Sequence, residues 1–306
     1  MSEQAATKVG LYVDVANVTQ NGGRGMRYDV LRDFAARGSS EPIRLNAYVT
    51  YDARRAKTDE AFKRGQLEFH SVLRDFGYKV VVKQVKWYSD GAGGEYGKAN
   101  ADLDMAVDAL LQSENLDRVV LATGDGDFVQ VVRALQNKGC RVEVVAFDNV
   151  SGDLKREADL FLSGSLIPGL LPTTTAPESK VPWGEDGSRV RGFCYTFLQD
   201  KLYGWMRYLK TIGPALWQTD SRRPDSPYGT AFVHVSQFQD FDVGPLPSRD
   251  YIFEFTLTRT EKGLQAHDVV QVSPPPRRAE APTEPVRVDA EVRLSSESGH
   301  DSIAAA

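Results

Sequence analysis

Cysteine and long hydrophobic runs are scarce in this chain of 306 residues, and each scarcity excludes a class of protein. The two cysteines, Cys140 and Cys194, are too few for a disulfide framework. They fall in different predicted domains, so we expect reduced, packed thiols. No apolar run is long enough for a transmembrane helix, and the first eight residues hold no apolar signal segment. We therefore expect a cytoplasmic protein with no membrane partner.

Phosphate-binding loops are also missing. The turn after the first predicted strand, residues 17–23, has neither the glycine spacing of a dinucleotide fold nor that of a Walker-type loop. This argues against a dehydrogenase or an NTPase. A phosphoacceptor domain of the receiver type would need an acidic nucleophile after the third strand and a lysine near the fifth, and neither is evident between Lys86 and Asp90 or after Phe147.

Strand and helix patterns alternate through the first half of the chain. Short β-branched runs predict strands, and the segments between them have helical periodicity. This alternation predicts a parallel, doubly wound α/β sheet with helices on both faces and the strand order 3-2-1-4-5. Ligands of such sheets bind outside the carboxyl ends of the strands, where the order reverses. The expected strands are 9–14, 43–50, 79–85, 118–123 and 141–147, and the expected helices are 27–37, 55–76, 101–113 and 126–138.

Four aspartates lie where these strands end or helices begin: Asp14, Asp102, Asp125 and Asp127. Asp14 ends the first strand and Asp125 follows the fourth, so the two carboxylates are expected to meet in one cleft. The helix that Asp102 opens, just after residues 91–94 and Lys98, can point its first turn into the same cleft. A carboxylate beside an apolar run is costly to bury unless a cation neutralises it. The economical explanation is a bound metal.

Carboxylates without a cysteine or histidine cluster favour Mg²⁺ or Mn²⁺ over zinc. A pair of such ions clamps the attacking and leaving oxygens in phosphodiester cleavage, so a metal-dependent phosphodiesterase is the leading hypothesis. Asn17 fits a contact to substrate or to metal-bound water, with a turn-forming side chain as the alternative. Asp108 fits either a position that supports the site from behind or a solvated helix face, and the face is favoured. His70 fits a packed helix position.

Helix capping is the alternative for these aspartates. It accounts for Asp102 or Asp127 taken singly. It does not account for Asp14, which ends a strand with no helical pattern after it, and it explains only one of Asp125 and Asp127. The set as a whole therefore favours a functional site.

Three separated motifs carry a resemblance to a known family. Residues 13–17 (VDVAN), Lys98 with residues 102–108, and residues 123–128 (TGDGDF) occur in the order seen in NYN domains, the LabA-like members of the PIN-like nuclease superfamily. The resemblance covers residues 7–165. It implies an Mg²⁺- or Mn²⁺-dependent ribonuclease on a Rossmann-like sheet. Its acidic positions map onto the four aspartates above, with Asp102 and Asp104 both open as the ligand from the third motif.

The net charge of −5 does not exclude a nucleic acid partner, because phosphate binding depends on a local basic patch. Three clusters are candidates, each with a solvated surface as the alternative. They are Arg54 and Arg55 with Lys57, Lys63 with Arg64, and Lys79 with Lys83 and Lys86.

The composition changes after the first domain. Residues 166–189 are rich in proline and threonine and are expected to form an extended linker. A strand pattern resumes over residues 190–273, and the tail at 274–306 is expected to be disordered. The chain is therefore expected to hold two domains joined by a hinge.

Aromatic residues alternate along strands of the second domain. Tyr203 with Trp205, and Phe232 with His234, are spaced by two, which puts each pair on one sheet face. Exposed aromatics of this kind stack single-stranded bases in small barrels, and Lys201 is placed to meet phosphate. The alternative is an aromatic core face, although a buried histidine would need partners.

These segments resemble a cold-shock domain, an OB-fold barrel that binds single-stranded nucleic acid. There are departures. Leu202 stands where the family usually has glycine, Thr196 replaces the first-strand tryptophan, Val235 replaces an aromatic, and residues 207–230 form a long insertion. The insertion is expected to be either a flap that grips phosphate or a disordered segment.

The two halves together predict a ribonuclease, with endonucleolytic cutting as the expected mode, whose barrel captures single-stranded RNA for the acidic cleft. Tethering raises the effective substrate concentration at the cleft to roughly the mM range. The alternative function is a non-catalytic RNA-binding adaptor. Oligomeric state is left open between monomer and homodimer.

Overall fold

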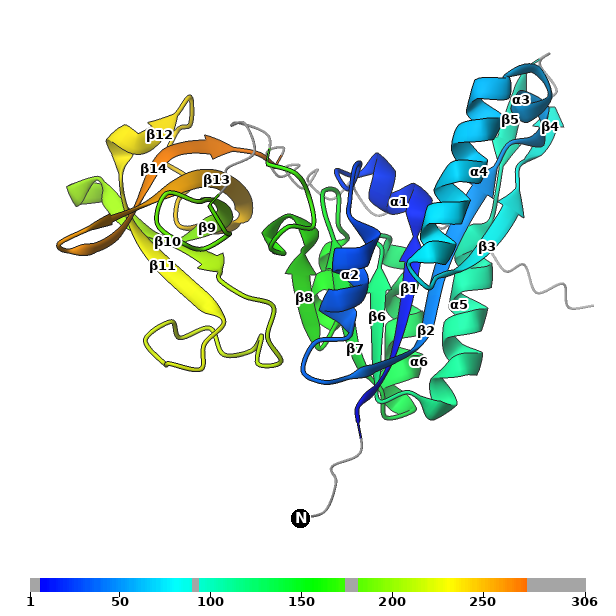
Figure 1. The fold of residues 1–306 in the computed structure, drawn as a ribbon, viewed down its shortest axis with the longest axis horizontal. Coiled ribbons are helices and arrows are strands. Elements are labelled where there is room, and N and C mark those ends of the chain that lie inside the picture. The colour runs from blue at the N-terminus through cyan, green and yellow to red at the C-terminus, as the bar shows by residue number, and fades with distance from the viewer. Residues whose placement is uncertain (1–5, 90–93, 174–180, 274–306) are drawn as a thin grey trace, which may run out of the picture. The chain divides into compact units, whose positions relative to one another are not determined.

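A computed structural model of the chain describes residues 6–89, 94–173 and 181–273 (Figure 1). The tail expected to be disordered lies outside these ranges, as does most of the glycine-rich stretch at 91–94. Among the helices that these ranges contain, none combines the length and the apolar character needed to cross a membrane.

The first domain is built on a parallel sheet of six strands, in the order β3-β2-β1-β6-β7-β8. The first five of these in chain order stand as 3-2-1-4-5, so the predicted order is confirmed. The sixth strand, β8, was not predicted, because four residues are too few to show a periodicity. The strands are β1 (Lys8–Asp14), β2 (Glu41–Tyr51), β3 (Lys79–Gln84), β6 (Arg118–Ala122), β7 (Arg141–Ala146) and β8 (Leu160–Ser163).

Helices cover both faces of this sheet, as predicted (Figure 1). The expected helix 55–76 is broken in two, because the Asp59 side chain accepts a hydrogen bond from the amide of Phe62 and caps the second piece. Two further short helices, α1 and α7, lack the length for a visible pattern. The helices are α1 (Val15–Gln20), α2 (Tyr28–Ala35), α3 (Ala53–Thr58), α4 (Glu60–Asp75), α5 (Ala101–Gln112), α6 (Val129–Asn137) and α7 (Gly152–Glu157), with 3-10 turns η1 (Ser113–Asn115), η2 (Gly126–Phe128) and η3 (Gly164–Leu166).

Alternation along β1 divides the core of this domain. Leu11 and Val13 pack with Leu31 and Phe34 of α2 on one face of the sheet. Tyr12 packs on the other face, in the cluster formed by α5, α6 and α7. Both cysteines are buried and unpaired, as expected.

A two-stranded hairpin, β4 (Lys86–Ser89) and β5 (Glu95–Lys98), stands between β3 and α5 and joins neither large sheet. It was not predicted, because each of its strands has only four residues. The hairpin leads directly into α5.

The second domain is a closed barrel of five strands, as the fold prediction requires. The pairing of Phe232 with Gln265 closes it, and Met206, Phe253 and Phe255 fill its interior. The short strand β12 (Phe238–Gln239) adds to β14. The barrel strands are β9 (Arg189–Leu198), β10 (Tyr203–Leu209), β11 (Tyr228–His234), β13 (Ser248–Thr260) and β14 (Gly263–Gln271), with 3-10 turns η4 (Gln199–Lys201) and η5 (Val235–Gln237).

Two segments expected to be extended or disordered differ in the structure. Leu166, Ile167 and Leu170, at the start of the expected linker, are buried, because they supply apolar side chains to the core of the first domain. The insertion is shortened to residues 210–227 by the strands on either side. Its Leu216 is buried, and the Leu216 carbonyl accepts a hydrogen bond from Tyr228 Oη.

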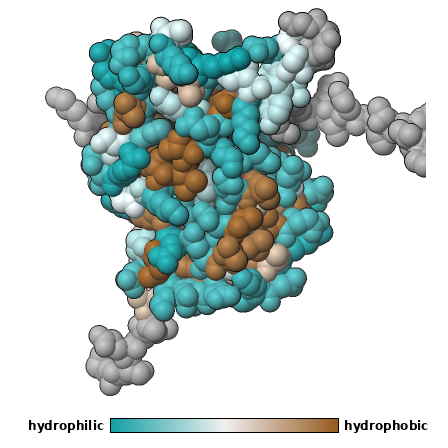
Figure 2. Space-filling model, turned by 90° about the vertical axis from the view of Figure 1, so that its right-hand side faces the viewer, coloured by the Kyte–Doolittle hydropathy of each residue, from teal (hydrophilic) through white to brown (hydrophobic). Residues whose placement is uncertain are grey.

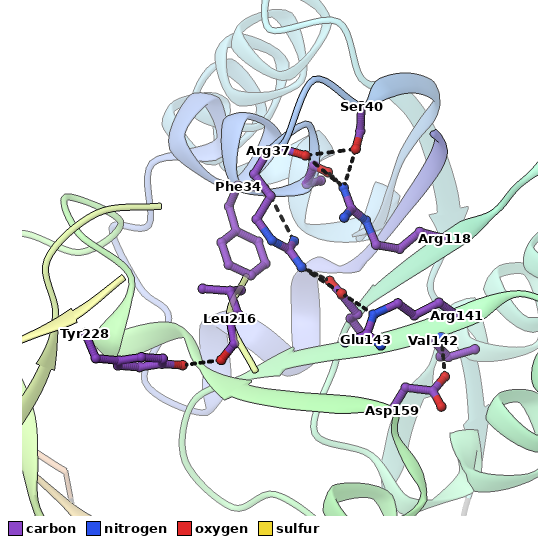
Figure 3. A network of polar contacts seen from close by, with 11 residues as sticks. Phe34, Arg37, Ser40, Arg118, Arg141, Val142, Glu143, Asp159, Leu216 and Tyr228 are labelled. Atoms are coloured by element: carbon purple, nitrogen blue, oxygen red, sulfur yellow. Dashed lines mark hydrogen bonds and ion pairs between the residues drawn. The ribbon is translucent and has the colours of Figure 1, made fainter. Parts of the chain in front are cut away.

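A buried ion pair joins Arg37, just after α2, to Glu143 of β7 (Figure 3). The Arg37 Nη2 to Glu143 Oε2 distance is 2.6 Å, and each side chain is only 2% exposed. Arg141 reaches the same carboxylate at 3.0 Å. Arg118, the first residue of β6, donates to the Ala35 carbonyl. These contacts fasten the end of α2 to the sheet at the edge where β6 and β7 begin.

Breaking the buried pair should destabilise the first domain strongly. Glu143→Leu leaves the Arg37 guanidinium buried without its carboxylate, so we expect the free energy of unfolding to fall by ~3–5 kcal/mol. Urea unfolding followed by circular dichroism measures this. The matched control is Arg133→Ala, which breaks an exposed pair with Glu157 and should leave the transition unchanged. An equal change in the free energy of unfolding for the two substitutions would contradict a stabilising role of the buried pair.

Candidate active site

The site lies at the carboxyl ends of β1 and β6, which are adjacent strands of the sheet. Val13 pairs with Ala122 in the parallel register. Asp14 is the next residue of β1, and Asp125 follows β6 after two further residues. The parallel pairing therefore brings the two predicted carboxylates to one edge of the sheet.

Asp14 is buried, with an exposed fraction of 4%. It is also the N-cap of α1, because its Oδ1 accepts a hydrogen bond of 3.0 Å from the amide of Asn17. The expectation that capping could not involve Asp14 is therefore wrong. The six residues of α1 are too few to show a helical pattern in the sequence.

Burial raises the pKa of the Asp14 carboxyl to about 6. The neighbouring carboxylates of Asp102 and Asp125 raise it further, while the hydrogen bond from Asn17 lowers it. The pKa of Asp102 is also raised, first by burial and then by the charges of Asp125 and Asp127. The side-chain contact with Asp102 also raises the pKa of Asp14. Asp14, Asp102 and Asp125 are named here the acidic cluster, because they lie close enough for the charges of neighbouring carboxylates to raise the pKa of Asp14 and of Asp102.

Asp102 and Asp104, the two candidates from the third motif, have different partners in the structure. Asp104 Oδ2 lies 2.7 Å from Lys83 Nζ of β3, so a lysine already balances its charge. Asp102 faces Asp14 instead. Asp108 accepts a hydrogen bond of 2.8 Å from Tyr48 Oη, so the interpretation as a merely solvated residue is wrong.

Asn17 and Thr123 connect the two strand ends. Asn17 Oδ1 accepts a hydrogen bond of 2.9 Å from the Gly124 amide. Thr123 is fully buried, and its Oγ1 accepts from the Asp125 amide at 3.2 Å and lies 3.5 Å from Asp14 Oδ2. Sequence reasoning did not single out Thr123, although it directly precedes the glycine and aspartate of its motif. Both residues hold the acidic cluster in place.

Asp127 lies at the rim of the site. It is exposed, and its amide donates a hydrogen bond of 3.0 Å to Asp125 Oδ1, which caps the turn η2. The negative charge of its carboxylate contributes to the raised pKa of Asp102.

The acidic cluster and Asp127 have the donor chemistry for a hard divalent cation. Within the described ranges, no ion pair involves any of these four residues. Among all the residues that the structure describes, no group of three or more acidic, histidine or cysteine side chains is arranged to hold a metal ion. Carboxylate oxygens suit Mg²⁺ or Mn²⁺ rather than zinc, so the residues fit such an ion and would have to draw together to hold it.

An open cavity of about 770 Å³ lies among α1, α2, α4 and β2. Its lining includes Val15 and Ala16, the residues directly after Asp14, together with Thr50, Gln66 and Phe69 from β2 and α4. Both polar and apolar side chains line this cavity, and none of the acidic-cluster residues does.

The three basic clusters are mostly paired or remote. Arg54 pairs with Glu95, Arg55 with Asp59, and Lys63 with Glu60. Lys79 begins β3 and so lies at the opposite edge of the sheet from the site. His70 is buried beside Tyr51 and Phe69, and burial lowers its pKa, which confirms the packed position.

The predicted aromatic surface lies on the outside of the barrel. Tyr203, Trp205 and Phe232 are half-buried and contact one another, with ring centroids 5.4–6.2 Å apart, whereas Gly204 and Met206 between them are buried. His234 is exposed beside them, opposite Tyr203 in the strand register, and Lys201 is exposed before β10. Leu202, where the cold-shock family usually has glycine, adopts a positive φ of 55°.

The insertion carries no free arginine pair. Arg222 pairs with Asp220, and Arg223 pairs with Asp225. Local carboxylates therefore already balance the two cations that a phosphate-gripping flap would use.

Comparison with known proteins places the first domain in a family. The sequence profile of the NYN domain matches residues 8–168, which is more than half of the chain. A curated relative, the low amplitude and bright protein LabA of Synechococcus elongatus, is 30% identical over 116 residues, covering 37% of this chain and 62% of the relative. The match thus spans less than two thirds of that relative's length. A crystal structure of a Vibrio parahaemolyticus protein of unknown function is 27% identical, covers 53% of this chain and 96% of that one, and has a TM-score of 0.44.

Replacing Asp14 should stabilise the protein when no metal is present. The pKa of Asp14 rises from 3.8 to about 6 on folding, so the folded state prefers the proton and loses stability as the pH rises from about 4 to about 6. In EDTA at pH 8, Asp14→Asn should raise the free energy of unfolding by ~1–3 kcal/mol. At pH 4 the gain should nearly vanish.

Urea unfolding at the two pH values measures this. Asp104→Asn is the matched control, because Asp104 is already paired with Lys83 and should show no such gain. If Asp14→Asn changed the free energy of unfolding by the same amount at pH 8 and at pH 4, burial of the charged carboxylate would not be the cause of the raised pKa.

Proposed function

This chain belongs to the NYN domain family, and we propose that it is an Mg²⁺- or Mn²⁺-dependent ribonuclease that hydrolyses phosphodiester bonds in single-stranded RNA. The observation that carries the proposal is Asp14, a buried carboxylate whose pKa is raised by burial and by two further carboxylates. Such a cluster costs stability, and a substrate-bound cation would offset that cost. The relation to PIN-like nucleases supports the reaction type.

Asp14, Asp102 and Asp125 would hold the metal, with Asp127 at the rim. When bound, a divalent ion supplies a water of lowered pKa and positive charge opposite the phosphate oxygens. The chain's own residues position these ligands. The Asn17 amide fixes one oxygen of Asp14, and the Asn17 side chain fixes the Gly124 backbone. Thr123 fixes the Asp125 backbone, so the carboxylates are directed by hydrogen bonds before substrate arrives.

The barrel would supply substrate capture. Tyr203, Trp205 and Phe232 form one aromatic surface on its outer face, and Lys201 adds an exposed cation near it. This arrangement supports the resemblance to a cold-shock domain, whose aromatics stack bases without reading a fixed sequence. We therefore propose that the barrel holds single-stranded RNA in the cytoplasm while the acidic cluster cuts it internally.

Substitution of neighbouring aspartates on α5 tests the site. Asp102→Asn should abolish cleavage of a labelled single-stranded RNA in Mn²⁺ or Mg²⁺, because it removes a carboxylate of the acidic cluster. Asp104→Asn should retain cleavage, because Asp104 pairs with Lys83. Gel analysis of a 5′-labelled oligonucleotide, with EDTA as the metal-free control, measures both.

The opposite ranking of the two variants would contradict the site. Wild-type protein that binds several RNA substrates in both metals and cuts none would instead favour the non-catalytic adaptor. Product lengths distinguish internal cutting from release of single nucleotides.

Removing the barrel aromatics should weaken RNA binding without changing the acidic cluster. Each base that loses its stacking partner costs ~1–3 kcal/mol, so Tyr203→Ala with Trp205→Ala should raise the Kd for single-stranded RNA about tenfold or more. Fluorescence anisotropy in EDTA measures the Kd. The control is Trp217→Ala, because Trp217 is 66% exposed and lies outside the aromatic surface. Equal affinities of wild type and double variant would show that these aromatics do not stack bases.

A further inference from the structure

The β4–β5 hairpin presents a second aromatic surface that the acidic cluster and the barrel do not include. Its antiparallel register sets Tyr88 opposite Tyr96, and Lys86 opposite Lys98. The two tyrosine rings stack, with centroids 5.7 Å apart and an interplanar angle of 28°. Their exposed fractions are 45% and 53%, so this ring pair belongs to no core.

The other face of the hairpin is fastened to the first domain. The guanidinium of Arg54 on α3 lies 5.1 Å from the centre of the Trp87 ring and pairs with Glu95 at 2.7 Å. Trp87 Nε1 also donates to Asp52 Oδ1, at 3.4 Å. Side chains alternate between the two faces of a strand, so these anchors engage one face and leave the tyrosines on the other.

The hairpin also lies close to the acidic cluster along the chain. The strand β5 ends only two residues before α5, whose second residue is Asp102. Tyr96 precedes Asp102 by six positions in the chain, so their Cα atoms are at most ~20 Å apart. A nucleic acid strand touching both would need only a few nucleotides between them.

We propose that Tyr88, Tyr96 and Lys86 form a stacking site for single-stranded RNA that leads the strand toward the acidic cluster. This rests on the proposed ribonuclease function and extends it. The argument for this occupant is charge complementarity. Lys86 is exposed and lies two residues before Tyr88 on the same strand face. A nucleotide whose base stacks on the tyrosine rings would therefore have its phosphate within reach of a cation.

A second exposed apolar surface of the same domain has a different character. Figure 2 shows apolar patches on the side of the molecule that is at the right of Figure 1. The helix α5 lies on this side and exposes Leu103, Val107 and Leu111. These aliphatic side chains offer no ring for a base. The hairpin, with rings and a lysine, is the surface suited to a nucleic acid.

Binding of a 5′-fluorescein-labelled single-stranded oligonucleotide to the full chain, followed by anisotropy in EDTA, tests this proposal. Tyr88→Ala with Tyr96→Ala should raise the Kd about tenfold or more. Tyr88→Phe with Tyr96→Phe keeps the rings and should bind like the wild type. Lys86→Ala should lower the slope of log affinity against log salt by about 0.7, as expected for one lost phosphate contact to a single strand. The control Leu111→Ala should change neither quantity.

An unchanged Kd in the alanine pair, or an equal loss in the phenylalanine pair, would overturn the proposal, whether or not the protein cuts RNA. If the alanine pair alters only the molar mass measured by light scattering, a second copy of the chain occupies the surface and the proposal is also overturned. Because binding is measured without metal, a failure of the ribonuclease function appears separately, as RNA that is bound and never cut.

Discussion

The structure depends on one unfavourable arrangement, the gathering of carboxylates at the carboxyl ends of two adjacent parallel strands. The pairing of β1 with β6 fixes Asp14 near Asp125, and the first turn of α5 adds Asp102. Burial of Asp14 excludes the water that would otherwise stabilise its charge, so its pKa rises. A bound cation would offset this repulsion, which is why we propose a metal ion at the cluster.

The surrounding contacts make sense as a frame for this cluster. Asn17 and Thr123 tie the two strand ends together by hydrogen bonds to backbone groups. At the other edge of the sheet, the buried pair of Arg37 and Glu143 fastens α2 to β7. Lys83 pairs with Asp104, so the charge of this carboxylate is balanced outside the cluster. Hydrogen bonds at one edge of the sheet and the buried ion pair at the other thus tie its strands and helices together.

Periodic features were predictable from the sequence, and short or directional ones were not. The strand order and the meeting of Asp14 with Asp125 followed from alternating strands and helices, and the outer aromatic face of the barrel followed from a spacing of two. The helix α1 and the β4–β5 hairpin are shorter than any detectable period. Asp102 and Asp104 could not be separated by sequence, because two residues differ by about 200° around a helix and only the neighbours decide which one faces the cluster.

Calorimetric titration of the full chain with Mn²⁺ at pH 6, in two buffers of different ionisation enthalpy, tests most directly whether the acidic cluster is a cation site. Because the pKa of Asp14 is about 6, a fraction of its carboxyls is protonated at this pH and must lose the proton when the ion binds. The account predicts Mn²⁺ binding accompanied by proton release, with the release lost in Asp14→Asn. Absence of binding, or binding with the same proton release in Asp14→Asn, would contradict it.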